Sequence, residues 1–245
     1  MSARVTVATA ERVLRQIRHD PRTIALLVGV PSLLLVLLRF VFDGQPEVFQ
    51  QIGAPLCGLF PFIVMFIVTS ITMLRERTTG TLERLMTLPV GKLDLLAGYA
   101  LAFGALAAVQ AVVVCLVGFA ALDLDAPHGA VLVAVLAVAN AVLGMSLGLF
   151  TSAFARTEFQ AVQFFPALVL PQLLLCGLFV ARDAMAPLLE AISWALPLTY
   201  AYRALAEATS AAPLDATVTL DALVVVGATL AALALGALTL RRRTA

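Results

Sequence analysis

The 245-residue chain is 62% hydrophobic and only 13% charged, and its mean hydropathy is +1.02. A soluble domain has roughly 45–50% apolar and about 25% charged residues, so this composition excludes an ordinary soluble globular protein. The net charge of +1 points to no partner by itself, and we expect no nucleic acid among the partners.

The first predicted element is an amphipathic helix over residues 5–19. Its apolar face consists of Ala10, Val13, Leu14 and Ile17, and its polar face of Arg12, Arg15, Gln16 and Arg18. A helix with one apolar and one basic face can lie flat on the inner leaflet of a membrane. Its arginines either only fix the orientation of the chain or dock a partner.

Six apolar stretches follow, each long enough to cross the hydrocarbon core, which takes about 20 residues of helix. They run over 23–42, 54–74, 95–121, 129–153, 161–181 and 220–240. The sequence therefore predicts an all-α, polytopic membrane protein. We expect one membrane domain over 1–245, made of a cytoplasmic amphipathic segment (1–22), six spans (23–240) and a cytoplasmic tail (241–245).

The distribution of charge predicts the orientation of these spans. Thirteen of the sixteen Lys and Arg residues fall at the two ends of the chain or in the loops after the second and fourth spans. The alternate loops carry nine acidic residues instead. Because cytoplasmic loops are enriched in Lys and Arg, both termini are expected in the cytoplasm.

The loop after the second span has features of a short helix. Gly80 can cap the helix at its start, Glu83 lies near its positive end, and Pro89 ends it. One apolar face is formed by Leu82, Leu85 and Met86. We predict a charged cytoplasmic helix with an adhesive side, the alternative being a solvated connector whose charges only set the topology.

Small residues recur at helical spacing in three spans: Gly98 and Ala102, Gly144 and Gly148, and Ala228, Ala232 and Gly236. In lipid, such positions let helix backbones approach closely, so we expect them on packing faces. The Gly144–Gly148 pair could serve a dimer or packing within the chain. Cys57, Cys115 and Cys176 lack metal-ligand spacing, and we expect them to be buried core residues.

Polar and helix-breaking residues mark the fourth and fifth spans. Pro166 and Pro171 each remove a backbone hydrogen bond, which predicts a kinked or broken helix that faces protein or a water-filled path. Residues that could line such a path are Asn140, Gln163, Pro166, Pro171 and Gln172.

Aromatic residues gather between the fifth and sixth spans, in the longest loop of the predicted outer side. The residues concerned are Trp194, Tyr200 and Tyr202, with Pro197 among them. Because Trp and Tyr prefer the headgroup level, we predict short helices that dip into the outer interface.

No catalytic or metal-binding constellation is recognisable in the sequence. His19 and His128 fall on opposite sides of the membrane in the predicted topology, and Lys92, the only lysine, lacks the pattern of a phosphate-binding loop. We therefore expect no enzyme activity, no cofactor and no metal in this chain. An intramembrane enzyme would need polar groups that the spans lack.

The stretch Arg75-Glu76-Arg77, followed by Gly80 to Leu85 and then Pro89, resembles the ABC-2 type transport permeases, especially their bacterial drug-export branch. The resemblance covers the whole chain. In that family this segment is a coupling helix that sits in a cleft of a separately encoded ATPase. The resemblance thus implies an ATPase-coupling role for Glu76, Gly80, Thr81, Leu82, Glu83, Arg84, Leu85 and Pro89.

The resemblance further implies the membrane subunit of an ATP-binding cassette exporter in the bacterial plasma membrane. Two copies of the chain would work with a separate ATPase that holds ATP and Mg²⁺. The few charges along the path favour a hydrophobic or amphipathic substrate, such as a drug, an antibiotic or a lipid-like metabolite. The alternatives are a permease for a cell-wall polysaccharide or lipid-linked glycan, and a non-transporting anchor that recruits a cytoplasmic partner.

Overall fold

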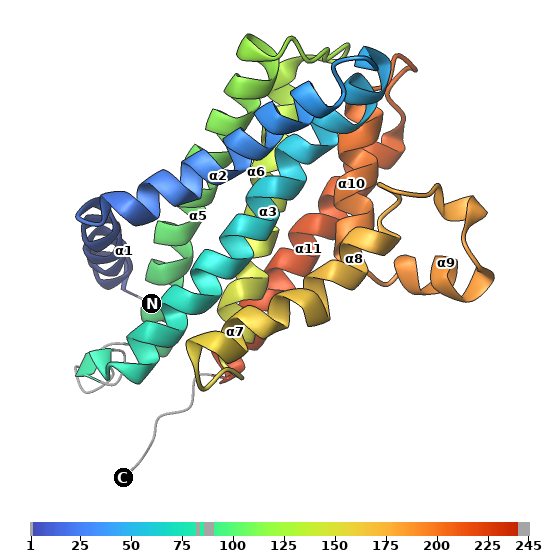
Figure 1. Cartoon of the computed structure of the whole chain (residues 1–245). Helices are drawn as coiled ribbons and strands as arrows, with labels where there is room; N and C mark the ends of the chain where they lie inside the picture. Colours follow the sequence, from blue (N-terminus) through green and yellow to red (C-terminus); the bar gives the residue numbers. More distant parts are fainter. Residues whose placement is uncertain (1, 82–83, 86–90, 240–245) are drawn as a thin grey trace.

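The computed structural model describes residues 2–81, 84–85 and 91–239, and the regular secondary structure of this part of the chain is all helical, without a β-strand. Six of its helical segments are long and apolar enough to cross a membrane. They form one bundle of tilted helices (Figure 1). The predicted all-α membrane fold with six spans is confirmed.

The helices correspond closely to the predicted spans. They are α2 (Pro21–Val41), α3 (Pro46–Thr78), α5 (Lys92–Leu116) with its π-helical end η1 (Val117–Ala121), α6 (Ala130–Thr151), α7 (Glu158–Phe164), η2 (Phe165–Val169) and α8 (Leu170–Leu175), and α11 (Ala216–Thr239). The second span begins earlier than predicted, because Pro46 suits the first turn of a helix. The fifth ends earlier, at Leu175, shortly before Gly177, whose φ of +105° breaks the helix.

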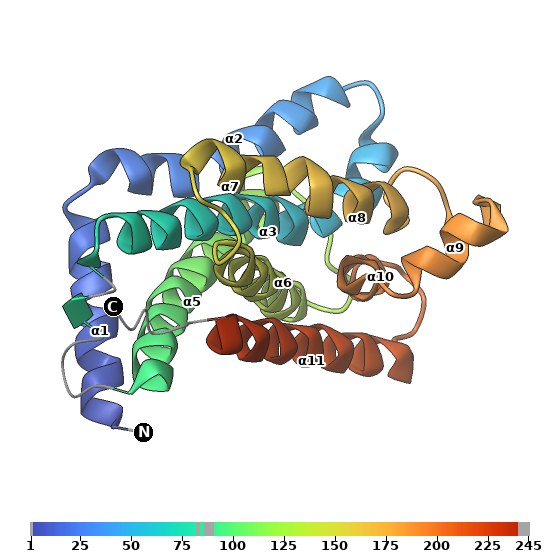
Figure 2. The same ribbon diagram turned by 90° about the horizontal axis from the view of Figure 1, so that it is seen from below.

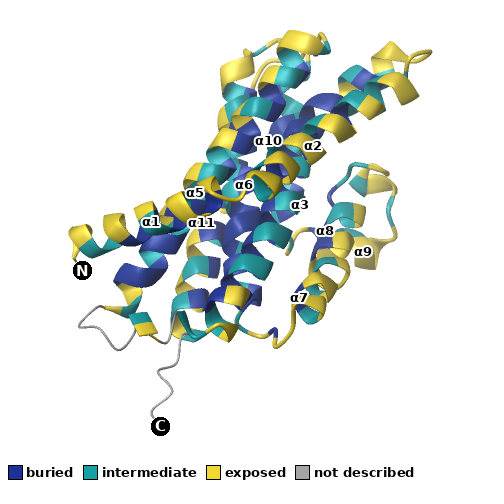
Figure 3. Ribbon diagram, turned by 60° about the vertical axis from the view of Figure 1, so that its left-hand side comes forward, coloured by how far each residue is buried: buried dark blue, intermediate teal, exposed yellow. Residues whose placement is uncertain are grey.

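The core of the bundle lies between α3 and α6, which are the most deeply buried of the spans. Buried residues gather along these helices (Figure 3). Gly144 and Gly148 let the backbones approach, since a Cβ at Gly144 would lie 2.2 Å from the carbonyl oxygen of Phe62, and one at Gly148 would lie 2.5 Å from that of Phe66. The glycine pair thus serves packing within the chain.

The predicted amphipathic helix is present as α1 (Ala3–Arg18), which runs across one end of the bundle (Figure 2). Its apolar residues Ala10, Val13 and Ile17 are buried. The helix packs against α5 at Gly98, where a Cβ would lie 2.5 Å from that of Thr9. The apolar face therefore packs against protein, and its contact with the membrane surface stays a prediction.

The fifth span is interrupted as predicted. Between α7 and α8 the backbone widens into the π-helical turn η2, which contains Pro166. Because proline cannot donate a backbone hydrogen bond and crowds the preceding turn, the regular α-helical pattern fails there. Cys57, Cys115 and Cys176 are buried free thiols, as expected.

Short helices follow the fifth span, as predicted for the loop that contains Trp194. They are η3 (Arg182–Ala184), α9 (Pro187–Ser193) and α10 (Pro197–Ala208). The α9 segment projects from the side of the bundle (Figure 1). In contrast, α10 packs against α3, α6 and α11 and buries Leu198 and Leu205, so it belongs to the bundle rather than to the surface.

The glycine contacts between α3 and α6 give a direct test of the packing. We expect Gly144→Ala to lower the free energy of unfolding by about 1–3 kcal/mol, the usual cost of overpacking, because the new Cβ meets the Phe62 backbone. Thermal unfolding in detergent measures the effect. The control is Gly227→Ala in α11, where nothing lies within 4 Å of the added Cβ; equal stability of the two variants would contradict the packing.

Candidate functional site

A buried polar cluster joins three helices at the C-terminal end of α3. The Glu76 carboxylate accepts a hydrogen bond from the Tyr99 hydroxyl at 2.7 Å and one from the Arg12 guanidinium at 3.3 Å. Arg12 also donates to the Tyr99 hydroxyl oxygen at 2.5 Å. Glu76 is only 5% exposed, Tyr99 is fully buried and Arg12 is partly exposed, so α1, α3 and α5 meet at a charge pair whose carboxylate is buried.

The electrostatics of this cluster depend on all three side chains. Burying a carboxylate costs free energy unless it has a counter-ion and hydrogen bonds. Arg12 is the counter-ion of Glu76, and both Arg12 and Tyr99 donate hydrogen bonds to it. The Arg12 guanidinium also lies over the Tyr99 ring, 5.6 Å from its centroid. A second tie holds α1 in place, because the Ser2 backbone amide donates to the Asp94 carboxylate at 3.0 Å.

The chain segment just after the cluster is the predicted coupling segment. Gly80 has a φ of +73°, which favours glycine, and its carbonyl oxygen accepts a hydrogen bond from the Arg84 amide at 3.0 Å. Thr81 and Leu85 are half-buried and Arg84 is exposed. Of the residues assigned to coupling from the sequence, Leu82, Glu83 and Pro89 lie outside the described part of the chain.

An exposed ion pair ties the end of α3 to the start of α7. Arg75 donates to both carboxylate oxygens of Glu158, at 2.6 and 2.9 Å. A two-pronged contact of this kind fixes orientation better than a single ion pair. The end of α3 that precedes the coupling segment is therefore held on one side by α7 and on the other by α1 and α5.

The sequence assigned Glu76 to the same surface segment as Gly80 and Arg84, but the structure buries it away from them. Sequence reasoning did not pair it with Arg12 or Tyr99. One available signal was that Tyr99 is the only tyrosine outside the loop that carries Tyr200 and Tyr202. A lone hydroxyl in an apolar span requires a polar partner.

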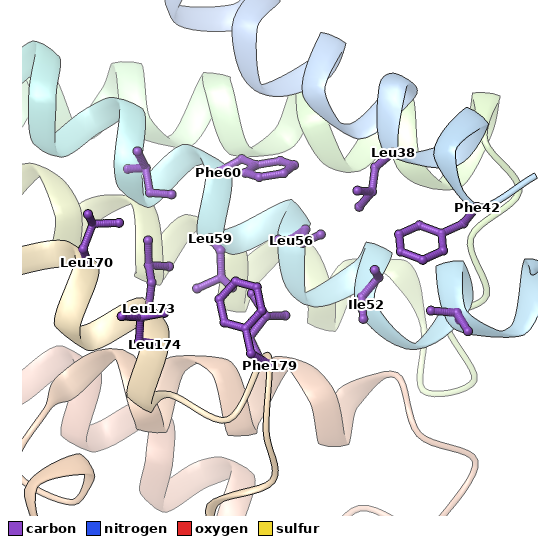
Figure 4. A pocket seen from close by; sticks show the side chains of 13 residues that line it. Leu38, Phe42, Ile52, Leu56, Leu59, Phe60, Leu170, Leu173, Leu174 and Phe179 are labelled. Atoms are coloured by element: carbon purple, nitrogen blue, oxygen red, sulfur yellow. The ribbon is translucent and has the colours of Figure 1, made fainter. Parts of the chain in front are cut away.

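A large apolar groove of about 530 Å³ lies between α2, α3 and α8 (Figure 4). Its lining side chains are all apolar and come from these helices and the residues that follow them: Leu38, Phe42, Val48, Ile52, Leu56, Leu59, Phe60, Ile63, Leu170, Leu173, Leu174, Leu178 and Phe179. The volume is within the range of small-molecule sites, roughly 300–1,000 Å³.

The five residues predicted to line a path do not meet in this groove. Asn140 is buried in α6 and donates to the Gly58 carbonyl oxygen at 3.1 Å, while Gln172 is turned inward. Gln163 of α7, Pro166 of η2 and Pro171 of α8 are exposed. The groove itself lies beside α8 and is apolar, so the polar residues of the sequence did not reveal it.

The predicted outer-interface residues form a second cluster at the start of α10. The Trp194 and Tyr200 rings meet edge to face at 6.0 Å, and the Tyr200 hydroxyl donates to the Trp194 carbonyl oxygen at 2.8 Å. Pro197 begins α10, and Tyr202 is half-buried. Nearby, Arg203 donates to Asp221 of α11 at 2.6 Å, and this contact raises the pKa of Arg203.

The fold and these sites define a multi-pass helical membrane protein. The family model described as ABC-2 type transporter matches residues 4–209. The chain belongs to the ABC-2 type transporter family. It is also similar to ABC transporter G family member 20 of Dictyostelium discoideum, with 29% identity over 138 residues. That match covers 56% of this chain and 19% of the relative, so the chain spans less than two thirds of the relative's length.

The buried cluster predicts an uneven response to substitution. We expect Glu76→Ala to lower the free energy of unfolding by about 1–3 kcal/mol, because the Tyr99 hydroxyl loses its acceptor and the Arg12 guanidinium loses its counter-ion. Tyr99→Phe keeps the ion pair and costs less, about 1 kcal/mol. Thermal unfolding in detergent distinguishes the two. The matched control is Glu47→Ala, an exposed residue of the same helix; a Glu76→Ala protein as stable as this control would contradict the cluster.

Proposed function

We propose that this chain is the membrane subunit of an ATP-driven exporter that moves a hydrophobic or amphipathic compound out of the cell. The observation that carries the proposal is the position of α3. Its first half lines the apolar groove and its last turns hold Glu76, directly before the coupling segment. One helix thus connects a surface suited to a partner with a surface suited to a substrate.

The same helix supplies a mechanism of coupling. The 33 residues of α3 give a length of about 50 Å, since a helix rises 1.5 Å per residue. A force on residues 79–85 acts at one end of this helix, and the Glu76 cluster makes α1 and α5 move with it. Pro55 and Pro61 lie in the groove-lining half, where each missing backbone hydrogen bond eases bending.

In this proposal the coupling residues divide into two groups. Gly80, Thr81, Arg84 and Leu85 contact an ATP-binding cassette ATPase, together with Leu82, Glu83 and Pro89 by their place in the sequence. Glu76 instead positions the end of α3, because its burial removes it from contact with another protein. ATP and Mg²⁺ belong to the ATPase, which we assign to a separate polypeptide.

The lining of the groove favours one class of substrate. All of its side chains are aliphatic or aromatic hydrocarbon, which suits a drug, an antibiotic or a lipid-like compound. A polysaccharide or lipid-linked glycan needs hydrogen-bonding partners for its hydroxyl groups, because burying unpaired polar groups is costly. The expected physiological role is therefore drug efflux and antibiotic resistance, rather than glycan export.

A second copy of the chain completes the assembly in this proposal. The groove-lining helix α2 and the α7–α8 span are among the least buried of the candidate spans, and a homodimer would enclose a path between two such faces. We place the assembly in a bacterial plasma membrane. Both termini are assigned to the cytoplasm by the positive-inside rule, because thirteen of the sixteen Lys and Arg residues lie at the two ends of the chain or in the loops after the second and fourth spans.

A non-transporting anchor would need the coupling segment and its supporting cluster, but it would need no groove beside α3. The presence of a groove of ligand size on the same helix favours transport. A measurement of transport by the assembled complex separates these functions.

The test uses the chain coexpressed with the ATPase encoded beside it and reconstituted in inverted vesicles. We expect ATP-dependent accumulation of a hydrophobic dye, and a decrease of about tenfold, equal to ~1.4 kcal/mol, in Arg84→Glu. The matched control Arg156→Glu reverses the charge of another exposed arginine, in the loop before α7, and should keep its activity.

Each other result would count against a part of the proposal. Accumulation of a lipid-linked oligosaccharide in place of the dye would reverse the substrate assignment. ATP hydrolysis that neither compound stimulates would favour the anchor. Full transport by Arg84→Glu would show that the coupling segment is wrongly placed.

A further inference from the structure

A second hollow, of about 360 Å³, lies at the junction of α8, α10 and the chain around Arg182. Unlike the apolar groove, it is lined by side chains of both charges: Arg182 and Arg203 bring guanidinium groups, and Glu207 brings a carboxylate. Tyr202 and Ser210 add hydroxyl groups. Its volume suits a small polar group.

Among the described residues, the hollow contains one cation, Arg182, and one anion, Glu207, that form no salt bridge. Arg203 is paired with Asp221, a nearly fully buried residue of α11. Within the described part of the chain, neither Arg182 nor Glu207 forms a salt bridge, and the Glu207 carboxylate accepts only the neutral hydroxyl of Thr217, at 3.1 and 2.8 Å. The Nη1 nitrogen of Arg182 is buried and has no hydrogen-bond partner.

The Arg182 guanidinium is held in position by an aromatic ring. It lies over Trp194 with its central carbon 4.1 Å from the ring centroid, while the Arg203 guanidinium lies 5.2 Å from the same centroid. The attraction between a cation and a ring face orients the group without neutralising its charge. The Arg182 guanidinium is therefore held in a fixed orientation with its charge unneutralised, which suits the binding of an anionic group.

The hollow lies beside the ends of two candidate membrane spans, where the headgroup region is expected. The fifth span ends at Leu175, directly before Cys176 and Gly177 of the hollow, and the sixth begins at Ala216, soon after Ser210. Trp and Tyr prefer this depth. Phe179 and Val180, a few residues before Arg182, are exposed apolar side chains that could contact acyl chains beside a bound headgroup.

We propose that this hollow binds the phosphoethanolamine headgroup of a membrane phospholipid, with the phosphate on Arg182 and the ammonium on Glu207. A purely anionic headgroup would bring a negative charge towards Glu207 and would supply no cation to that carboxylate. A quaternary ammonium would carry charge but could not donate a hydrogen bond to the carboxylate. The headgroup with both a phosphate and a primary ammonium matches both unpaired groups.

The chain carries its own reporter of this site, because Trp194 is its single tryptophan. Purified protein in detergent is titrated with short-chain phosphatidylethanolamine, phosphatidylcholine, phosphatidylglycerol and free phosphoethanolamine while the Trp194 fluorescence is followed. We expect saturable binding of phosphatidylethanolamine, at least about fivefold tighter than the other three probes, as one charge-assisted contact would give.

Substitutions test the role of each charge. Arg182→Gln should weaken binding of phosphatidylethanolamine about tenfold, and Glu207→Gln should abolish its preference over the other two lipids. The control Arg156→Gln changes an exposed arginine in the loop before α7 that does not line the hollow, and this variant should bind as the unmodified protein does. Native mass spectrometry of lipid adducts repeats the comparison without relying on Trp194, and gel filtration verifies that each variant is folded.

Three results would overturn the proposal: unchanged binding in Arg182→Gln, tighter binding of phosphatidylglycerol than of phosphatidylethanolamine, or free phosphoethanolamine binding as tightly as the lipid. The last would reassign the site to a soluble zwitterion. The site does not depend on the proposed export function, since the titration needs neither the ATPase nor a transported compound.

Discussion

The buried carboxylate of Glu76 is the constraint around which one end of this bundle, the end where α3 terminates, is organised. A charge in an apolar helix bundle is stable only with a counter-ion and hydrogen bonds, and here both come from other helices. Arg12 brings α1 across the end of the bundle, and Tyr99 brings α5 against α3. The hydrogen bonds that the Glu76 carboxylate requires thus hold α1, α3 and α5 together.

The two faces of α3 differ in how tightly they are packed. On one face, Gly144 and Gly148 of α6 bring the two backbones into contact, so α3 and α6 behave as a single body. On the other face, large apolar side chains border the groove and leave space before α8. A push on the end of α3 would therefore change the groove rather than the core, because packed interiors resist compression.

The sequence predicted the parts of this structure that depend on local pattern. Long apolar runs located the six spans, and the period of Ala10, Val13 and Ile17 located α1. Pairings between distant residues were not predictable in the same way. Glu76 was grouped with its neighbours Gly80 and Arg84, because nothing in the local sequence indicates that Tyr99, 23 residues away, is its hydrogen-bond donor.

The polar residues of the spans did not indicate where the groove lies, for a similar reason. Asn140 was a reasonable path-lining residue, yet its amide satisfies the backbone carbonyl of Gly58 where α3 and α6 meet. In lipid, a polar side chain stabilises helix contacts as readily as it lines a path. The groove could not be predicted from individual residues, because its leucines and phenylalanines look like any other apolar residues until three helices bring them together.

The most direct test of the account measures the width of the groove while the ATPase works. Spin labels at Ile52→Cys in α3 and Leu174→Cys in α8, in a chain without its three native cysteines and diluted with unlabelled copies, report the distance across the groove. Trapping the ATPase with a non-hydrolysable ATP analogue should shift this distance, and Glu76→Gln should abolish the shift. A distance that nucleotide leaves unchanged in the protein with Glu76 intact would contradict the account.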